Sequence, residues 1–209
     1  MKLAPLGALL ALAFSTGCDR VLMPPAHPVY AAWEEGLTLG FEDPSLAPEL
    51  RVQRRQQVRV KEARSQSGGL AVTKTFTSMT GQFDTQVLQK DGGVALQTDR
   101  GGLVLLPEGF PDQVSRWEAR GCFNWVVGRA AADLPGVKLP DGAGTVGVWV
   151  ESLALGSGAR SRTLFLPDIG EAETLIWNQG RWIVSNLLVT RGFTDIPRKP
   201  ADNTSGSKP

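Results

Sequence analysis

The chain of 209 residues contains a single histidine, His27, and this scarcity excludes several kinds of active site. A Ser-His-Asp triad, a Cys-His pair and a multi-histidine zinc site all need histidine within a folded pocket. His27 instead lies in the proline-rich run Pro24-Pro25-Ala26-His27-Pro28, which is typical of a stiff spacer. We therefore expect none of these three kinds of chemistry.

Cysteine and net charge are also scarce. The two cysteines, Cys18 and Cys122, are too few for a disulfide scaffold or a metal cluster. The formal net charge of +1 gives no field strong enough to attract nucleic acid. The sequence also lacks a phosphate-binding loop, a dinucleotide fingerprint and a Cys-x-x-Cys pair. We expect no metal, no cofactor and no nucleic-acid partner.

An export signal at the start of the chain is the most informative feature that is present. Lys2 supplies a positive charge, and an apolar run extends from Leu6 to Phe14. Such a run rises only about 13 Å as a helix, which is too short for the core of a bilayer. The charge, the length and the small residues that follow predict a signal peptide over residues 1–17.

The residues after this run resemble the lipobox of bacterial lipoproteins, in which small or apolar residues precede an invariant cysteine. Here Ser15, Thr16 and Gly17 precede Cys18, and Ser15 departs from the motif because leucine is usual there. The resemblance implies that Cys18 becomes the mature N-terminus and is lipidated, with acyl chains such as palmitate. Two or three acyl chains anchor firmly, since each buried methylene contributes about 0.8 kcal/mol. The alternative is an ordinary cleaved signal, with Cys18 free or paired with Cys122.

The remainder of the chain is expected to form one domain. We predict a lipidated N-terminus and proline-rich spacer over residues 18–29 and a single β-rich domain over residues 30–197. Residues 198–209 have no apolar side chain able to anchor them, so we predict a disordered tail. Cys122 lies in an apolar run and is interpreted as a buried, unreactive thiol.

Recurring glycine-rich turns, such as Ser67-Gly68-Gly69 and Asp91-Gly92-Gly93, predict a mainly β domain. Short runs rich in Val, Thr, Leu, Phe and Trp separate these turns. The expected strands are Leu37–Glu42, Val52–Ala63, Leu70–Met79, Gln82–Gln89, Val94–Thr98, Leu103–Leu106, Val114–Glu118, Gly121–Val127, Thr145–Leu155, Arg160–Leu166, Glu173–Trp177 and Arg181–Thr190.

Period-two alternation predicts which side chains share a face of a strand. Two such sets are Phe83, Thr85 and Val87, and Trp182, Val184 and Asn186. The best hairpin joins Glu173–Trp177 to Arg181–Thr190 through Asn178-Gln179-Gly180. Helix is scarce: Ala47–Gln57 favours a helix but strand competes, and a second short helix over Val29–Glu35 is an option.

The segment Arg160–Thr190 resembles the closing meander of several bacterial envelope proteins, in which a strand ends in a proline-containing turn and two more strands follow. The corresponding residues are Phe165-Leu166-Pro167-Asp168-Ile169-Gly170-Glu171, Thr174–Trp177 and Arg181–Val189. The likeness extends to the half-barrel fold of periplasmic lipoprotein carriers, whose curved antiparallel sheet surrounds a hydrophobic cavity. This resemblance implies a fold and carries over no binding residue.

We therefore expect a mainly β fold: a strongly curved antiparallel sheet, or half-barrel, with at most one or two short helices. A closed lipocalin-like barrel and a β-sandwich are the alternatives. The concave side of such a sheet must be filled by helix, side chains or ligand.

Aromatic and basic residues form two groups that could carry function. We interpret the tryptophans as core and sheet-edge packing, with Trp33 the best candidate for a functional or rim position. They are Trp33, Trp117, Trp125, Trp149, Trp177 and Trp182. The basic cluster is interpreted as a solvated strand face, and contact with anionic lipid or an acidic partner is the alternative. It comprises Arg51, Arg54, Arg55, Arg59, Lys61 and Arg64.

Carboxylates gather at Asp168, Glu171 and Glu173, and again at Glu108 and Asp112. A pair of acids can hydrolyse glycosides without histidine if their separation is right. Turns with acids on the solvent side are the preferred interpretation of both groups.

These observations favour a non-catalytic protein over an enzyme. We expect it to be anchored in a bacterial membrane through Cys18, facing the periplasm or the cell exterior. It would bind an apolar or lipid ligand, or dock to another envelope protein. The alternative is a secreted or anchored hydrolase that uses carboxylates. Apart from the lipidation site Cys18, no catalytic, metal or ligand-binding residue is assigned.

Overall fold

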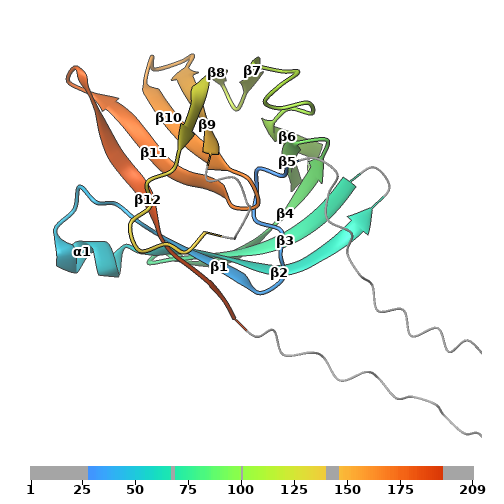
Figure 1. Cartoon of the computed structure of the whole chain (residues 1–209), viewed down its shortest axis with the longest axis horizontal. Coiled ribbons are helices and arrows are strands. Elements are labelled where there is room, and N and C mark those ends of the chain that lie inside the picture. The colour runs from blue at the N-terminus through green and yellow to red at the C-terminus, as the bar shows by residue number, and fades with distance from the viewer. Residues whose placement is uncertain (1–27, 67–68, 100, 140–145, 195–209) are drawn as a thin grey trace, which may run out of the picture.

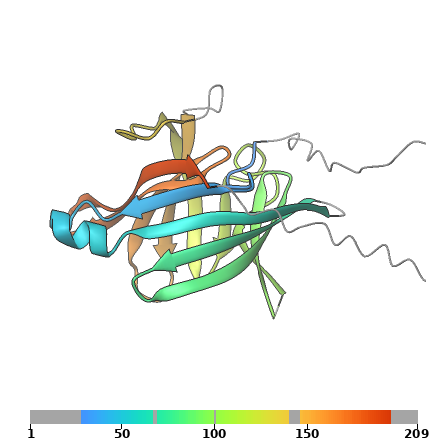
Figure 2. The same ribbon diagram turned by 90° about the horizontal axis from the view of Figure 1, so that it is seen from below.

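The computed structural model describes residues 28–66, 69–99, 101–139 and 146–194. They form a twelve-stranded antiparallel sheet that curves into a nearly closed barrel (Figures 1 and 2). The predicted signal peptide, the lipidation site Cys18, His27 and the predicted tail 198–209 lie outside these ranges.

The strands are short and are joined mostly by tight turns. They are β1 (Leu37–Glu42), β2 (Gln56–Gln66), β3 (Gly69–Ser78), β4 (Gly81–Lys90), β5 (Gly93–Thr98), β6 (Gly101–Leu106), β7 (Arg116–Ala119), β8 (Cys122–Ala131), β9 (Val146–Ala154), β10 (Arg160–Leu166), β11 (Gly170–Asn178) and β12 (Arg181–Phe193). Each run predicted from the sequence overlaps one of them. The expected strongly curved antiparallel sheet is confirmed, and its curvature continues past a half-barrel towards closure.

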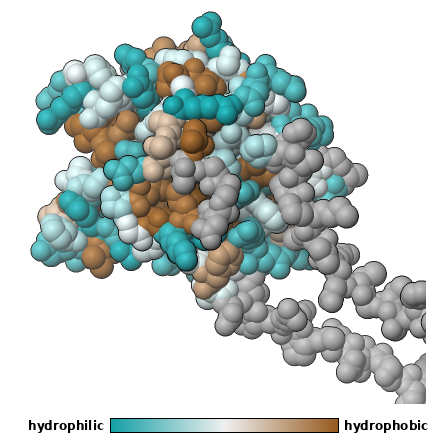
Figure 3. Space-filling view, viewed as in Figure 1, coloured by the Kyte–Doolittle hydropathy of each residue, from teal (hydrophilic) through white to brown (hydrophobic). Residues whose placement is uncertain are grey.

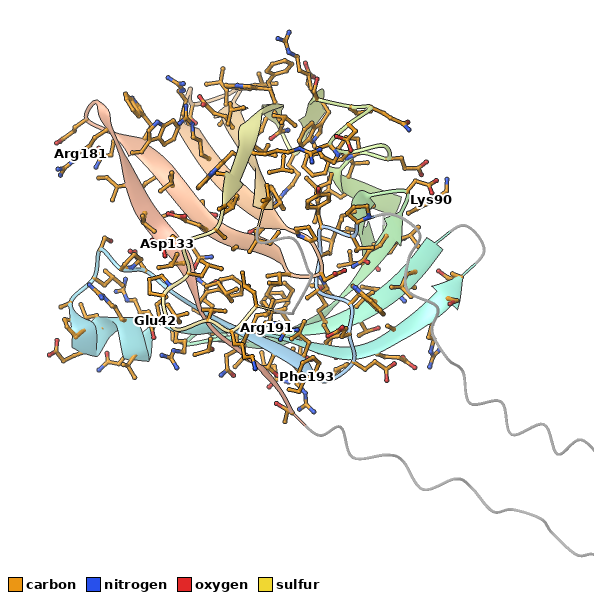
Figure 4. All side chains as sticks on the ribbon, viewed as in Figure 1. Glu42, Lys90, Asp133, Arg181, Arg191 and Phe193 are labelled. Atoms are coloured by element: carbon orange, nitrogen blue, oxygen red, sulfur yellow. The ribbon has the colours of Figure 1, made fainter. Side chains whose placement is uncertain are left out.

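The sheet consists of two meanders that meet at one long-range pairing. The spatial order is β6-β5-β4-β3-β2-β1-β12-β11-β10-β9-β8-β7. β1 pairs with β12 from Leu37 opposite Phe193, so the end of the last strand, where Arg191 and Phe193 lie, runs beside the first strand (Figure 4). β6 and β7 are the two edge strands, and residues 107–115 connect them across the remaining gap.

The one helix within the described ranges, α1 (Pro48–Gln53), lies at one end of the barrel (Figures 1 and 2). Pro48 fits its first turn, where the missing N–H has no partner in any case, and Glu49 lies near its positive end. It covers only the first half of Ala47–Gln57, and β2 begins at Gln56. The helix prediction is therefore correct for the first half of that segment, and the strand prediction is correct for its end.

The prediction of an optional second helix over Val29–Glu35 is wrong. This segment is irregular and lies inside the curve of the sheet, as the blue trace between the green and orange halves in Figure 1. It bonds to the turn between β10 and β11, where Asp168 N–H donates to the Val29 carbonyl at 2.6 Å. Val29, Tyr30, Ala31 and Ala32 are all buried.

Period-two alternation places the predicted residues Phe83, Thr85 and Val87 on the inner face of β4, where they line the lumen. The same prediction fails for β12. Val184 pairs with Leu175 while Asn186 pairs with Thr174, and consecutive residues of a strand face opposite sides. A β-bulge leaves one extra residue in β12 at this point, so Asn186 turns into the lumen although Trp182 and Val184 face outwards.

Candidate functional site

The lumen of the barrel holds a cavity of about 350 Å³, which is within the size range of small-molecule sites. Its walls are mainly apolar. Leu39, Phe41, Val58, Phe76, Phe83, Val87, Val94, Leu96, Leu105, Leu106, Phe165 and Ile169 supply most of the apolar lining. Apolar residues also gather in the middle of the molecular face in Figure 3, between the two halves of the sheet, while the rim is mostly hydrophilic.

The buried segment after residue 28 forms part of the cavity wall. Tyr30 lies edge-on to Phe110, with ring centroids 5.0 Å apart, and so packs against the connection that closes the barrel. The indole N–H of Trp33 donates to the Asp168 carboxylate at 2.9 Å. Trp33, the best candidate among the tryptophans for a functional or rim position, therefore holds this segment against the β10–β11 turn, and Asp168 is its acceptor.

Two cross-strand pairs of β3 and β4 define the inner face of the cavity. Phe76 lies opposite Phe83, and their rings stack at 5.5 Å between centroids. The next pair inwards is Lys74 opposite Thr85. A polar pair thus lies directly behind an aromatic pair, and the same face continues with Val72 opposite Val87.

Lys74 is the most unusual residue of the lumen. It is 7% exposed, and its ammonium makes no hydrogen bond or ion pair to any residue that the structure describes. Burial lowers the pKa of Lys74 from 10.5 to about 8, and attraction to the Glu171 carboxylate offsets only part of this effect. The hydroxyl of Thr85 is buried as well and has no hydrogen-bond partner within the described ranges.

Glu171 and Arg120 supply the other charges of the cavity. Glu171 pairs with Phe165 across β10 and β11 and therefore faces the lumen, where protein surrounds it but its carboxylate remains open to the cavity. Desolvation raises the pKa of Glu171, and the charges of Arg120 and Lys74 oppose that rise. Arg120 reaches the cavity from the β7–β8 turn.

The other predicted acids do not join Glu171. Glu173 pairs with Leu164 on the opposite face of the sheet, because a bulge follows that pair. There, desolvation first and the nearby Asp133 second raise the pKa of Glu173. Glu108 bonds Lys90 at 3.0 Å, and Asp112 bonds Arg129. In the described ranges no group of three or more His, Cys, Asp or Glu side chains could hold a metal ion.

A second buried charge, Glu151, lies in the outer face of the sheet and was not identified from the sequence. It is 1% exposed, and both Arg160 and Arg162 donate to its carboxylate, Arg162 at 2.8 Å. Burial alone would raise the pKa of Glu151, but the two arginines outweigh it and hold that pKa below its usual value. Both guanidinium groups also lie over the ring of Trp182, which contacts Trp177 edge-on.

The basic cluster is held largely by local interactions. Arg55 pairs with Glu42, Lys61 with Asp84 at 2.7 Å and Arg64 with Glu62 at 2.5 Å. Arg51 donates to the Leu46 carbonyl at 2.7 Å, beside α1. This arrangement favours the solvated strand face over a dedicated membrane patch.

Cys122 is a free, half-buried thiol at the start of β8. Its alternative partner, Cys18, lies outside the described ranges. Among the helices that the structure describes, none is long and apolar enough to cross a bilayer.

Comparison with known proteins supports the fold. No protein-family model matches the chain, and no curated protein matches it. The chain is similar to a solved structure from Bacteroides fragilis, described as an exported protein with a YmcC-like fold. The TM-score is 0.53 at 10% identity, over 79% of this chain and 100% of that one. A Parabacteroides distasonis protein described as a lipoprotein gives a TM-score of 0.45 at 11% identity, over 79% and 99% of the two chains.

Proposed function

We propose that this protein is a non-catalytic envelope lipoprotein that is tethered to a bacterial membrane through Cys18 and binds the apolar part of a ligand in its barrel lumen. The observation that carries the proposal is the cavity of about 350 Å³ with mainly apolar walls. Water molecules bind weakly in such a cavity because its walls offer few hydrogen-bond partners. An apolar ligand gains about 25 cal/mol for each Å² of its surface that leaves water.

The export half of the proposal is supported by the first 18 residues, with their positive charge, short apolar run and terminal cysteine. The Bacteroides fragilis protein of similar fold is itself described as exported. The carboxylate-dependent hydrolase receives no comparable support, because Glu171 and Glu173 lie on opposite faces of the sheet.

Binding to the lumen can be tested with N-phenyl-1-naphthylamine, a neutral apolar dye that fluoresces when it leaves water. We expect saturable binding to the purified protein. Leu96→Trp should abolish most of it, because Leu96 lines the cavity and a larger ring would fill the space. The matched control is Gln97→Trp on the adjacent, outward-facing and exposed position of β5, which should bind as the wild type does. No saturable binding, or equal binding by both variants, would refute the lumen site.

The anchor can be tested separately by metabolic labelling of the producing bacterium with radioactive palmitate. We expect the wild-type chain to be labelled and to sediment with membranes. The Cys18→Ala variant should be unlabelled and recovered in the soluble fraction, while Cys122→Ala serves as the control and should stay labelled. An unlabelled wild type would remove the anchor from the proposal and leave the lumen site untouched.

A further inference from the structure

We infer that the ligand of the lumen is a single-chain amphiphile with an anionic head group, and that the head group binds Lys74. This inference rests on the proposed lumen-binding function and adds the chemical class of the ligand. It is carried by one buried lysine that lines the mainly apolar cavity and has no hydrogen-bond partner in the described parts of the chain.

The unpaired ammonium of Lys74 lowers the stability of the folded protein. A buried ammonium without a hydrogen-bond acceptor is strongly unfavourable, and proteins normally pair such a group or replace it with an apolar residue. The Lys74 side chain lines the cavity, so a ligand in the lumen can reach its ammonium. An oxyanion there would accept a charge-assisted hydrogen bond from it.

The charges that line the cavity also favour an anion. Lys74 and Arg120 are cations, and Glu171 is the one carboxylate among the residues that line it. A head group of one negative charge would therefore enter a site with a surplus of positive charge.

The apolar walls on both sides of Lys74 can accommodate an alkyl chain. The Lys74–Thr85 pair is flanked along the sheet by Phe76 opposite Phe83 on one side and by Val72 opposite Val87 on the other. Phe83 is 57% exposed, so the aromatic pair forms the mouth of the site. A head group at Lys74 would leave the alkyl chain to lie against the remaining apolar wall, including Leu96 and Leu105. A polar spot within an apolar tube is the arrangement that orients an amphiphile.

The test is isothermal titration calorimetry of the purified protein with three probes of equal chain length: decanoate, decyl phosphate and decan-1-ol. We expect both anions, or one of them, to bind about tenfold or more tightly than the alcohol, as one charge-assisted hydrogen bond allows. The stronger of the two anions then identifies a carboxylate or a phosphate head group. Equal affinity for the alcohol and both anions would overturn this inference and leave the proposed function standing. Failure of all three probes to bind would overturn both.

One variant assigns the effect to Lys74. Lys74→Met should lower the affinity for the preferred anion about tenfold or more and leave decan-1-ol binding intact. The control is Lys61→Met on the outer face of the neighbouring strand, which should change nothing. Unchanged anion binding by Lys74→Met would refute the site.

A readout without mutation follows from the pKa of Lys74, which is about 8. The preference for the anion over decan-1-ol should fall as the pH rises above that value, because the ammonium loses its proton. Glu171 and Arg120 face the same space, so the titration is repeated with Glu171→Gln. Persistence of the fall assigns it to Lys74, and its disappearance would overturn the role of Lys74.

Discussion

Glu151 in the outer wall and Lys74 in the lumen are both buried charges, at 1% and 7% exposed, but their surroundings differ completely. Arg160 and Arg162 neutralise the Glu151 carboxylate, and two tryptophan rings cover the arginines. Within the described ranges the Lys74 ammonium has no hydrogen bond or ion pair, and its surroundings are mostly apolar. The protein itself therefore pairs the Glu151 carboxylate, whereas the Lys74 ammonium remains available to a ligand.

This difference separates a structural charge from a candidate binding charge. A buried ion pair costs desolvation but recovers it from its own geometry, so its removal affects stability. An unpaired buried charge lowers stability and is retained only if another requirement outweighs that cost. Substitutions at the two positions should therefore act on different properties of the protein, and this contrast can be tested directly.

The largest effect is expected for Lys74→Met at alkaline pH. In the folded wild type the pKa of Lys74 is lowered from 10.5 to about 8, so between these values the unfolded chain holds a proton that the folded chain has released. Wild-type stability should therefore rise with pH across this window, whereas below pH 8 the full penalty of the buried ammonium remains. The advantage of the methionine variant at pH 7 should shrink by up to about 3 kcal/mol towards pH 10.5. Urea unfolding of both proteins across this range measures it, and parallel curves would contradict it.

Glu151→Gln should have the next largest effect, a loss of about 2 kcal/mol in the free energy of unfolding at pH 7. Breaking a fully buried pair costs more, but Arg160 and Arg162 are partly exposed and water can compensate them. The control is Glu108→Gln, which breaks the exposed pair with Lys90 and should leave the urea midpoint unchanged. Similar midpoints for both variants would show that Glu151 is not the structural charge proposed here.

Glu171→Gln should give a smaller change of opposite sign. Because desolvation raises the pKa of Glu171, the fold favours the protonated carboxyl, and that favour is lost as the pH rises through the raised pKa. The glutamine variant should therefore be more stable than the wild type at neutral pH and should lose this advantage in acid. Thermal unfolding at pH 7 and pH 4 tests the sign, and an advantage that grows in acid would contradict it.

The smallest effect is expected for Trp177→Phe on the outer face. Trp177 is 41% exposed, and Arg160 lies 5.6 Å from its ring centroid. Phenylalanine keeps an aromatic ring beside Trp182 and weakens the exposed cation–π contact, which contributes about 0.5–1 kcal/mol, so the variant should unfold at a slightly lower urea concentration. Binding of N-phenyl-1-naphthylamine should remain unchanged, because the ring lies outside the barrel. Weaker dye binding would show that the two faces are coupled.

The sequence predicted this fold well because most of the sheet is local. Eleven neighbouring strand pairs build it, and all but the β1–β12 pair join strands that are consecutive in the chain. Turn residues and alternation are sufficient for such hairpins, which explains the agreement for Leu37–Glu42 and Arg160–Leu166. The nearly closed barrel was foreseen only as an alternative to the half-barrel, because it depends on two long-range events: β1 pairs with β12, and the edge strands β6 and β7 approach each other. The bulge at Ser185 was also missed, since one extra residue leaves the composition of a strand unchanged.

The site was less predictable than the fold, for a physical reason. Alternation in Gln82–Gln89 correctly placed Phe83, Thr85 and Val87 on one face, but it did not show that this face surrounds a cavity. Lys74 was not singled out, because one lysine in a strand usually points to water. Its burial depends on the strand register, which places it opposite Thr85, and on the opposite side of the barrel, which contributes Glu171 to the same cavity.

The junction of β1 and β12 has a consequence for how the chain could be rewired. Thr194 N–H donates to the Gly36 carbonyl at 2.9 Å, so the end of β12 lies beside the start of β1. A circular permutant that links Thr194 to Val29, keeps the buried segment before β1 and opens the connection between β6 and β7 would place all twelve strands in the order in which they pair. Every contact between neighbours would then be a hairpin, the mean sequence separation of contacts would fall, and the permuted chain should fold faster than the natural one.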